Sequence, residues 1–460
     1  MRTEFRDVSG WRADGLPVTT FSDEAAKMLD SCITQLTTWK EDDLGIEKTL
    51  EKMSSADPHF TLGRVFTHQI QLIGTGTSGR KNPQILSELK ELRKSVAFIT
   101  DRESSHLDAA IWLAEGQMSA ACLVLEDILK KYPTDMLAIK VAHDCYFYLG
   151  NQSEMLASIE RVLPRWSSHS PLQNYLYGMQ AFGLCETGQY EEAGKIALKG
   201  LELDRTDAWS THANSHVYEM TSRPDEGIAF LSRTVNDWQP AGLLSCHNFW
   251  HWAVFHIEKG ESEAALDLFD SEIGERSKSG AMLDYVDAAS LLYRLELEGV
   301  NVDDKWKILF EETEKHLEDQ ILLFNDAHFA MTLLGLKDHD RFRKFQDSVN
   351  SVEDVAEIDN FRITNLFGKK LIQAMKDYST GNFDECTTSL LEIKPDLVQM
   401  GGSDAQRDVF DLLLINAAIK SENQRDQAKK LLDLRSCARR QSPMVDRLKA
   451  RLQRREPSLL

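Results

Sequence analysis

Apolar and polar residues follow a helical period along most of the chain, in pairs of amphipathic stretches that meet at a short turn. Such a pair is typical of a helical hairpin, which buries its apolar face only by packing on the next hairpin. The turn residues are 34, 38, 34, 38 and 39 positions apart: Gly116, Gly150, Gly188, Ser222, Gly260 and Gly299. This interval predicts an array of two-helix repeats.

Small residues recur where the two helices of a hairpin must come close. Three pairs of alanines twelve positions apart show this spacing: Ala109 with Ala121, Ala181 with Ala193, and Ala253 with Ala265. Pro133 and Pro58 follow second helices and end them. Strand patterns are almost absent. We therefore predict an all-α fold, a tetratricopeptide-type right-handed α-solenoid of helical hairpins.

The regularity of the pattern divides the chain into three parts. Residues 1–100 are predicted to form an N-terminal helical hairpin and capping region, 101–335 the regular tetratricopeptide-like repeats, and 336–460 divergent helical repeats that end in a basic capping helix. The loop 74–83 is rich in Gly, Ser and Thr but lacks the order of a phosphate-binding loop, so we interpret it as a connector. The basic C-terminal helix is expected to cap the array, with a partner site as the alternative.

Composition narrows the classes of function. The chain has 460 residues, 42% of them hydrophobic and 27% charged, and its formal net charge is −20. Such a surface repels phosphate backbones, so we expect no nucleic-acid partner. No apolar run is long enough to span a bilayer, and the first residues lack a signal-peptide pattern, so we expect no membrane partner either. The seven cysteines are scattered and form no CxxC, which favours reduced thiols and a cytoplasmic protein.

Several stretches resemble one known family over nearly the full length of the chain. They include RDVSGWRADGLPVTTFSDEAAKMLD, LIGTGTS, YPTDMLAIKVAHDCYFYLGNQ, RTDAWSTHANSHVYEM, CHNFWHWAVFHIEKGESEAAL, GAMLDYVDAASLLYRLELEGV, LLFNDAHFAM and GGSDAQRDVFDLLLINAA. In order and spacing the chain resembles the tetratricopeptide repeat protein 38 family. The resemblance implies a soluble α-helical repeat fold and brings no catalytic residues with it.

Histidines are concentrated in two neighbouring repeats. His212 and His216 are four residues apart on one predicted helix, and His247 and His251 are four apart on another, so each pair shares a helical face. Counting repeat positions from the turn residue places these imidazoles on the concave face of the array. The candidate ligand-binding or metal-binding residues are His212, His216, Glu219, His247, His251, Glu258, Asp326 and His328. The secondary candidates in the groove are Asp144, Glu186, Asp287 and Arg294.

Three interpretations of this cluster remain open at the level of sequence. The groove binds a small ligand, or a protein or peptide partner, without chemistry. Alternatively, the chain is a hydrolase-like enzyme that uses the cluster as acid and base or as ligands for a divalent metal. The third interpretation is that the histidines bridge helices beside aromatic residues and bind nothing. The HExxH order of metalloproteases is absent, and the polar residues concentrate in three repeats, which favours a compact site for a small ligand over a peptide groove.

Overall fold

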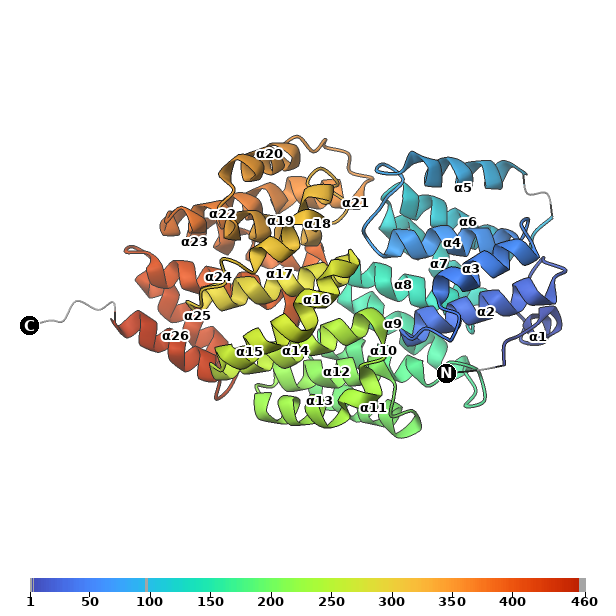
Figure 1. Ribbon diagram of the computed structural model, residues 1–460, viewed down its shortest axis with the longest axis horizontal. Helices are drawn as coiled ribbons and strands as arrows, with labels where there is room; N and C mark the ends of the chain where they lie inside the picture. Colours follow the sequence, from blue (N-terminus) through green and yellow to red (C-terminus); the bar gives the residue numbers. More distant parts are fainter. Residues whose placement is uncertain (1, 3, 96–97, 455–460) are drawn as a thin grey trace, which may run out of the picture. The chain divides into compact units, whose positions relative to one another are not determined.

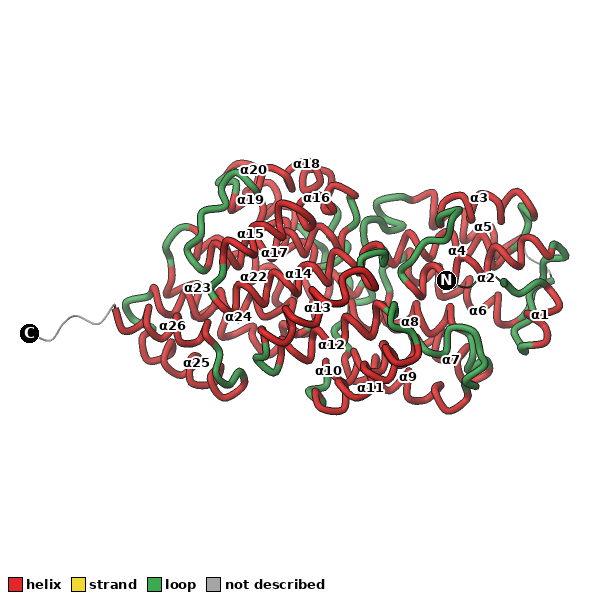
Figure 2. The backbone as a smooth tube through the Cα atoms, turned by 60° about the horizontal axis from the view of Figure 1, so that its bottom comes forward, coloured by secondary structure: helices red, strands yellow, loops and turns green. Residues whose placement is uncertain are grey.

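All regular secondary structure in the protein is helical. The structure, a computed structural model, describes residues 2, 4–95 and 98–454, and no strand occurs in these ranges. Figure 2 accordingly shows only helices and loops. The predicted all-α class is therefore confirmed. None of the helices within the described ranges is both long and apolar enough to cross a bilayer.

The chain folds into two compact units. Unit 1 comprises Met1–Asn214, Asn236–Ser245 and Ala356–Asp359, and unit 2 comprises Ser215–Val235, Cys246–Val355 and Asn360–Leu460. Three of the five boundaries along the chain fall inside the helices α12 (Ala208–Met220), α13 (Pro224–Trp238) and α14 (Gly242–Lys259). The three-part division expected from the sequence stays a prediction.

The helices that precede α12 pack mostly on their neighbours in sequence (Figure 1). They are α1 (Val8–Ala13), α2 (Asp23–Thr38), α3 (Ile46–Ala56), α4 (Thr61–Ile73), α5 (Pro83–Ser95), α6 (Asp101–Ala114), α7 (Met118–Lys131), α8 (Met136–Tyr148), α9 (Gln152–Val162), α10 (Tyr175–Glu186) and α11 (Tyr190–Leu203). From α6 to α11 each helix contacts the next one, which is the local packing of an α-solenoid.

The helices after α14 belong to unit 2 and show the same sequential packing. They are α15 (Ser262–Leu268), α16 (Gly274–Arg276), α17 (Met282–Leu297), α18 (Trp306–His316), α19 (Leu323–Gly335), α20 (His339–Asn350), α22 (Lys369–Ser379), α23 (Phe383–Ile393), α24 (Asp404–Lys420), α25 (Arg425–Ala438) and α26 (Pro443–Arg454). The short α21 (Asp359–Ile363) runs from one unit into the other. Short 3₁₀ or π segments are Leu163–Arg165, Phe269–Ile273, Ser277–Ser279, Thr364–Gly368 and Lys394–Met400. In addition, α17 packs on α24, which brings distant parts of the sequence together.

The predicted turn residues adopt the backbone conformation that the hairpins require. Each has a left-handed φ between 56° and 88°: Gly116, Gly150, Gly188, Ser222, Gly260 and Gly299. Glycine reaches this region without steric cost, whereas Ser222 occupies it with a side chain. The six alanines of the twelve-residue pairs are all fully buried. The helices also come close at Gly227 in α13, where an added Cβ would lie 2.4 Å from the ring of Phe255 in α14.

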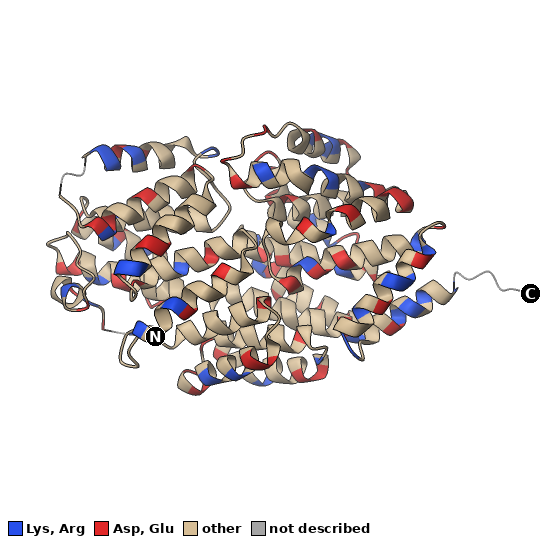
Figure 3. Cartoon of the chain, turned by 180° about the vertical axis from the view of Figure 1, so that it is seen from behind, with Lys and Arg blue, Asp and Glu red and all other residues tan. Residues whose placement is uncertain are grey.

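The basic C-terminal helices cap other helices of unit 2. Basic residues gather on α25 and α26, beside the C-terminal end of the described chain (Figure 3). Arg447 donates to the carbonyls of Ile257 and Glu258, in the last turn of α14, at 2.7 and 2.9 Å. Arg451 donates in the same way to Leu297 and Glu298, at the end of α17. Cations at helix C-termini meet both the last free carbonyls and the negative end of the helix dipole.

Candidate metal centre

Helices α12 and α14 bring three histidines of unit 2 together: His216, His247 and His251. His247 and His251 lie one turn apart on α14, and His216 lies on α12, one turn after His212, which belongs to unit 1. Each of the three offers a ring nitrogen, and these nitrogens lie within 4.8 Å of one another. The helical spacing of four residues is what aims both rings of a pair to the same side.

Two of the imidazoles are oriented by buried carboxylates of unit 2. Nδ1–H of His247 donates to both carboxylate oxygens of Asp287 in α17, at 2.9 and 2.8 Å. Nδ1–H of His251 donates to Oε2 of Glu219 in α12, at 2.8 Å. Because a carboxylate can only accept, the proton of each neutral ring is on Nδ1 and its lone pair is on Nε2.

The rings of His216, His247 and His251, all in unit 2, lie close together. The ring centroids lie 4.5 Å apart between His216 and His251, 4.8 Å between His247 and His251, and 6.3 Å between His216 and His247. His251 is nearly perpendicular to both of the others, at 71° and 77°. The ring of His247 also stacks on Trp250, with 9° between the planes, which limits its rotation.

Burial favours the neutral form of two of these rings, His216 and His251, which are fully buried. His212 and His247 are exposed by only 4% and 3%. Burial lowers the pKa of His216 well below its usual value, and the neighbouring His251 adds to the effect. Burial also lowers the pKa of His251, with contributions from His247 and Arg294. Burial disfavours the charged form, and the neutral imidazole is the form that binds metal ions.

Arg294, Asp408 and Arg435, which are far apart in the sequence, form a charged layer beside the histidines. Arg294 in α17 is buried, lies over the ring of Trp250 at 5.5 Å, and donates to the carbonyl of Ala405 at 2.7 Å. Its guanidinium is also 3.6 Å from Asp408 in α24. Asp408 accepts two hydrogen bonds from Arg435, at 2.6 and 2.8 Å, and these cations hold the pKa of its carboxyl far below the usual range although burial opposes them.

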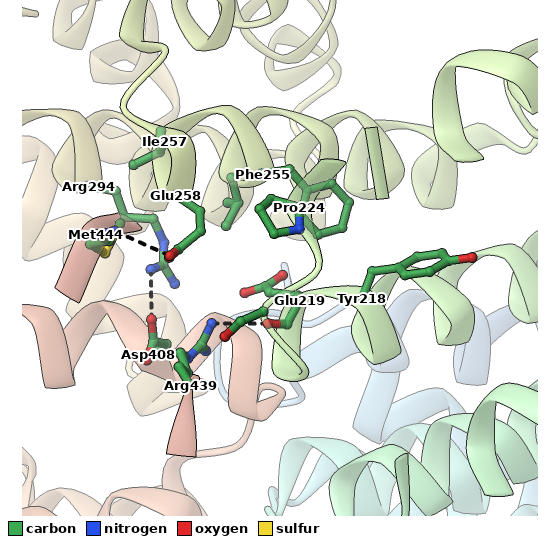
Figure 4. Close-up of a pocket in the computed structure, with 12 residues that line it drawn as sticks. Tyr218, Glu219, Pro224, Phe255, Ile257, Glu258, Arg294, Asp408, Arg439 and Met444 are labelled. Carbon is green, nitrogen blue, oxygen red and sulfur yellow. Dashed lines mark hydrogen bonds and ion pairs between the residues drawn. The ribbon is translucent and has the colours of Figure 1, made fainter. Parts of the chain in front are cut away.

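A narrow pocket reaches this layer from solvent. It is lined by Tyr218, Glu219, Ser222, Pro224, Val254, Phe255, Ile257, Glu258, Arg294, Asp408, Arg439 and Met444. All of these residues belong to unit 2. In Figure 4, dashed lines mark the interactions of Arg294 with Asp408 and of Arg439 with Glu219. The pocket encloses about 360 Å³ including the part that opens to solvent, but its inner room is only that of about one water molecule.

The other predicted site residues have separate partners. Glu258 accepts hydrogen bonds from the Ser442 hydroxyl and from the Met444 backbone N–H, the latter at 3.4 Å. His328 donates from Nδ1 to the carbonyl of Phe324 on its own helix, at 2.7 Å, and burial lowers its pKa to about 4. Asp326 is buried, and neither it nor His328 belongs to the group of three.

The two secondary candidates in unit 1 also form local pairs. Asp144 pairs with Lys140, one turn earlier on α8. Glu186 at the end of α10 accepts from the side-chain amide of Gln152, at 3.0 Å. Of the secondary candidates, only Asp287 and Arg294 are therefore tied to the histidines or to the charged layer beside them.

Sequence reasoning missed the residues that enclose the site. Asp408, Arg435 and Arg439 were not among the candidates, although Arg439 lines the pocket and donates to the carbonyl of Glu219 at 3.3 Å. The basic segment RSCARRQ was the one sign of these residues in the sequence, because it holds three arginines in seven residues. Arginines that are buried need acceptors nearby. It was interpreted only as part of a capping region.

The donor set fits a transition-metal ion. Three imidazole nitrogens, those of His216, His247 and His251, suit zinc, copper, iron or nickel, and a tetrahedral zinc site would separate them by about 3.3 Å. The distances between these nitrogens, which are at most 4.8 Å, would have to shorten by up to about 1.5 Å. Carboxylates on Nδ1 of His247 and His251 are the outer partners that metal-binding histidines have. No family model matches this sequence.

Proposed function

We propose that the protein binds one divalent transition-metal ion, Zn²⁺ in the first place, through His216, His247 and His251. The observation that carries the proposal is the pair of carboxylate–histidine contacts, Asp287 with His247 and Glu219 with His251, beside three ring nitrogens within 4.8 Å. Each carboxylate directs the Nε2 lone pair of its ring and raises its basicity. Buried histidines that only bridge helices do not need this arrangement.

The test is the metal content of the chain made without an affinity tag, since a polyhistidine tag binds the same metals. After dialysis against Zn²⁺ and removal of free ions, we expect about one ion per chain by plasma mass spectrometry. Co²⁺ in place of Zn²⁺ should give the strong visible absorption of a tetrahedral site.

The variants His216→Ala and His251→Ala should each bind Zn²⁺ at least about 100-fold more weakly, since a ligand is lost. His256→Ala is the matched control, because His256 lies on α14 but bonds to Glu261 near the surface. A parent protein that binds no metal, or two variants with the affinity of the parent, would contradict the proposal.

The burial of the cluster supports an ion or another very small ligand over a peptide. A peptide partner needs side chains spread along an accessible groove, and all three imidazoles are at least 96% buried. We extend the proposal to the fold: a tetratricopeptide-type solenoid of the tetratricopeptide repeat protein 38 family that works in the cytoplasm. The turn interval of 34 to 39 residues and the seven free cysteines support this assignment.

A metal-dependent hydrolase is the second candidate, and one observation favours it. Oε1 of Glu219 is buried without a hydrogen-bond partner on the wall of the pocket, while Oε2 accepts from His251. A carboxylate in this position could take a proton from a water molecule. Catalytic zinc has three protein ligands and keeps an open coordination position for water, and the three histidines of unit 2 would leave that position free. Equal rates of 4-nitrophenyl acetate hydrolysis by zinc-loaded and metal-free protein would count against it.

A further inference from the structure

We infer that the pocket beside Glu219 is the access route of the metal ion, and that the segment Arg439–Met444, which joins α25 to the first turn of α26, is its gate. This inference rests on the metal binding proposed above. It concerns how fast the site exchanges its ion, which the geometry of the histidines does not determine.

The pocket leads to the histidines through Glu219. None of the three histidines lines it, but Glu219 does, and its Oε2 accepts from Nδ1–H of His251. The other oxygen, Oε1, is buried and has no hydrogen-bond partner. One carboxylate therefore faces the pocket and also contacts a proposed ligand. An ion that leaves its hydration shell needs an oxygen donor on its path, and this oxygen is available.

A second carboxylate lies on the same wall. Glu258 lines the pocket from the last turns of α14, and it accepts hydrogen bonds from the Ser442 hydroxyl and the Met444 backbone N–H. The third, Asp408, is held by Arg435 through two hydrogen bonds and is less available to an ion. Glu258 and Glu219 thus form two successive acceptor positions between the gate and His251.

The gate is a short segment with few anchors. Arg439 donates to the carbonyl of Glu219 at 3.3 Å and lies 3.4 Å from Asp408. The Ser442 hydroxyl and the Met444 N–H donate to Glu258. Gln441, between them, is exposed and has a left-handed φ of 58°. The segment is therefore fixed partly by contacts to the wall of the pocket, while Ser442 also accepts from the N–H of Val445 at the start of α26, and Arg447 anchors that helix.

The size of the pocket makes the gate necessary. Its inner room is that of about one water molecule, whereas a hydrated divalent ion carries a full shell of waters. The ion can pass only when the segment moves aside, so the opening of the gate should limit the exchange rate. Loosening the anchors should then speed uptake and release together and change the equilibrium affinity much less.

The experiment measures release of Zn²⁺ from the loaded, untagged protein into excess EDTA, at chelator concentrations where the rate no longer depends on EDTA. We expect Arg439→Ala and Ser442→Ala to release Zn²⁺ at least about tenfold faster than the parent, with dissociation constants within about threefold. Arg454→Ala is the matched control, because Arg454 is exposed at the end of α26. Circular dichroism establishes that each variant is folded, and Ser442→Ala carries the test if Arg439→Ala does not fold.

The outcomes separate this inference from the proposal on which it rests. If the parent binds Zn²⁺ and both variants release it at the parent rate, the proposed gate is contradicted, whereas the proposed metal site is not. If release is faster in Arg454→Ala as well, the effect is general loosening of the C-terminal helices, and the gate is again wrong. A parent without Zn²⁺ removes the proposed function and the gate with it.

Discussion

Asp287 accepts a hydrogen bond from Nδ1–H of His247 with both of its carboxylate oxygens, at 2.9 and 2.8 Å. The two residues lie on different helices, α17 and α14, and both are buried. The bond determines which ring nitrogen carries the proton and so which one can bind an ion. The same bond stabilises the carboxylate of Asp287, whose pKa is raised by burial.

The Asp287→Asn substitution should weaken the proposed metal binding. An amide of the same size retains an acceptor oxygen but loses the negative charge that makes His247 a stronger ligand, so we expect Zn²⁺ affinity to fall about 10- to 100-fold. Competition with a chromophoric chelator measures this change. Asp284→Asn, on the same helix, is the control, because Asp284 accepts from Ser279. Equal affinities of the Asp287 variant and the parent would show that the bond has only a structural role.

A buried histidine of unit 1 should make the protein less stable in mild acid. His143 is buried between the rings of Phe182 and Trp209, and burial lowers its pKa to about 3. Its pKa in the unfolded chain is about 6.5. Below pH 6.5 the folded state therefore binds fewer protons than the unfolded chain. The contribution of neutral His143 to the free energy of unfolding is fully present above pH 6.5 and is lost as the pH falls from 6.5 toward 3.

The measurement is urea unfolding at pH 7 and pH 5. Replacing His143 by Phe removes the titrating group and should reduce the loss of unfolding free energy between these pH values by about 2 kcal/mol. His169→Ala removes an exposed histidine, so its loss of unfolding free energy between pH 7 and pH 5 should equal that of the parent. Parallel pH profiles for the parent and the His143 variant would show that His143 is already solvated or paired in solution.

The buried pair of Asp408 and Arg435 should be costly to break. Asp408→Asn removes the charge that compensates Arg435, Arg439 and Arg294, and it leaves these cations in a region of low polarity. Removing one partner of a buried ion pair costs about 3–5 kcal/mol of unfolding free energy. Denaturant unfolding measures it, with Asp433→Asn at an exposed position of α25 as the control. A change below about 1 kcal/mol would mean that water reaches these groups.

The local rules of a helix made part of this site predictable. A spacing of four residues places His212 with His216 and His247 with His251 on shared faces whatever surrounds the helices. The turn glycines were recognisable for the same reason, because a left-handed φ restricts the residue type. The partners were not predictable in this way: 40 residues separate His247 from Asp287, and 220 separate Glu219 from Arg439. Such pairs depend on how whole helices stack, which no local pattern determines.

The close approach of α13 to α14 should not tolerate a methyl group. At Gly227 a Cβ would lie 2.4 Å from the ring of Phe255, which is buried and lines the pocket. Gly227→Ala therefore forces the helices apart or rotates the ring, and we expect a loss of about 1–3 kcal/mol by urea unfolding. Arg233→Ala at an exposed position of α13 should change stability by less than about 0.5 kcal/mol. A more stable Gly227 variant would mean that helix propensity outweighs the contact.

The C-terminal arginines should stabilise the helix ends that they cap. Arg447 donates to the carbonyls of Ile257 and Glu258 and pairs with Glu298 at 2.8 Å, so one guanidinium joins the ends of α14 and α17. Removing it in Arg447→Ala leaves two carbonyls of α14 and the carboxylate of Glu298 without this donor, and we expect a loss of about 1–2 kcal/mol. Arg447→Lys keeps the charge but lacks the planar fork that reaches all three acceptors, so it should recover less than half of the loss.

Arg454→Ala serves here too as the exposed control on the same helix and should leave the thermal midpoint unchanged. If Arg447→Ala and Arg454→Ala shift the midpoint equally, the capping contacts contribute nothing beyond general surface charge. If Arg447→Lys restores the parent midpoint completely, the interaction is one of charge with the helix dipole, and the directed hydrogen bonds to Ile257 and Glu258 are not required.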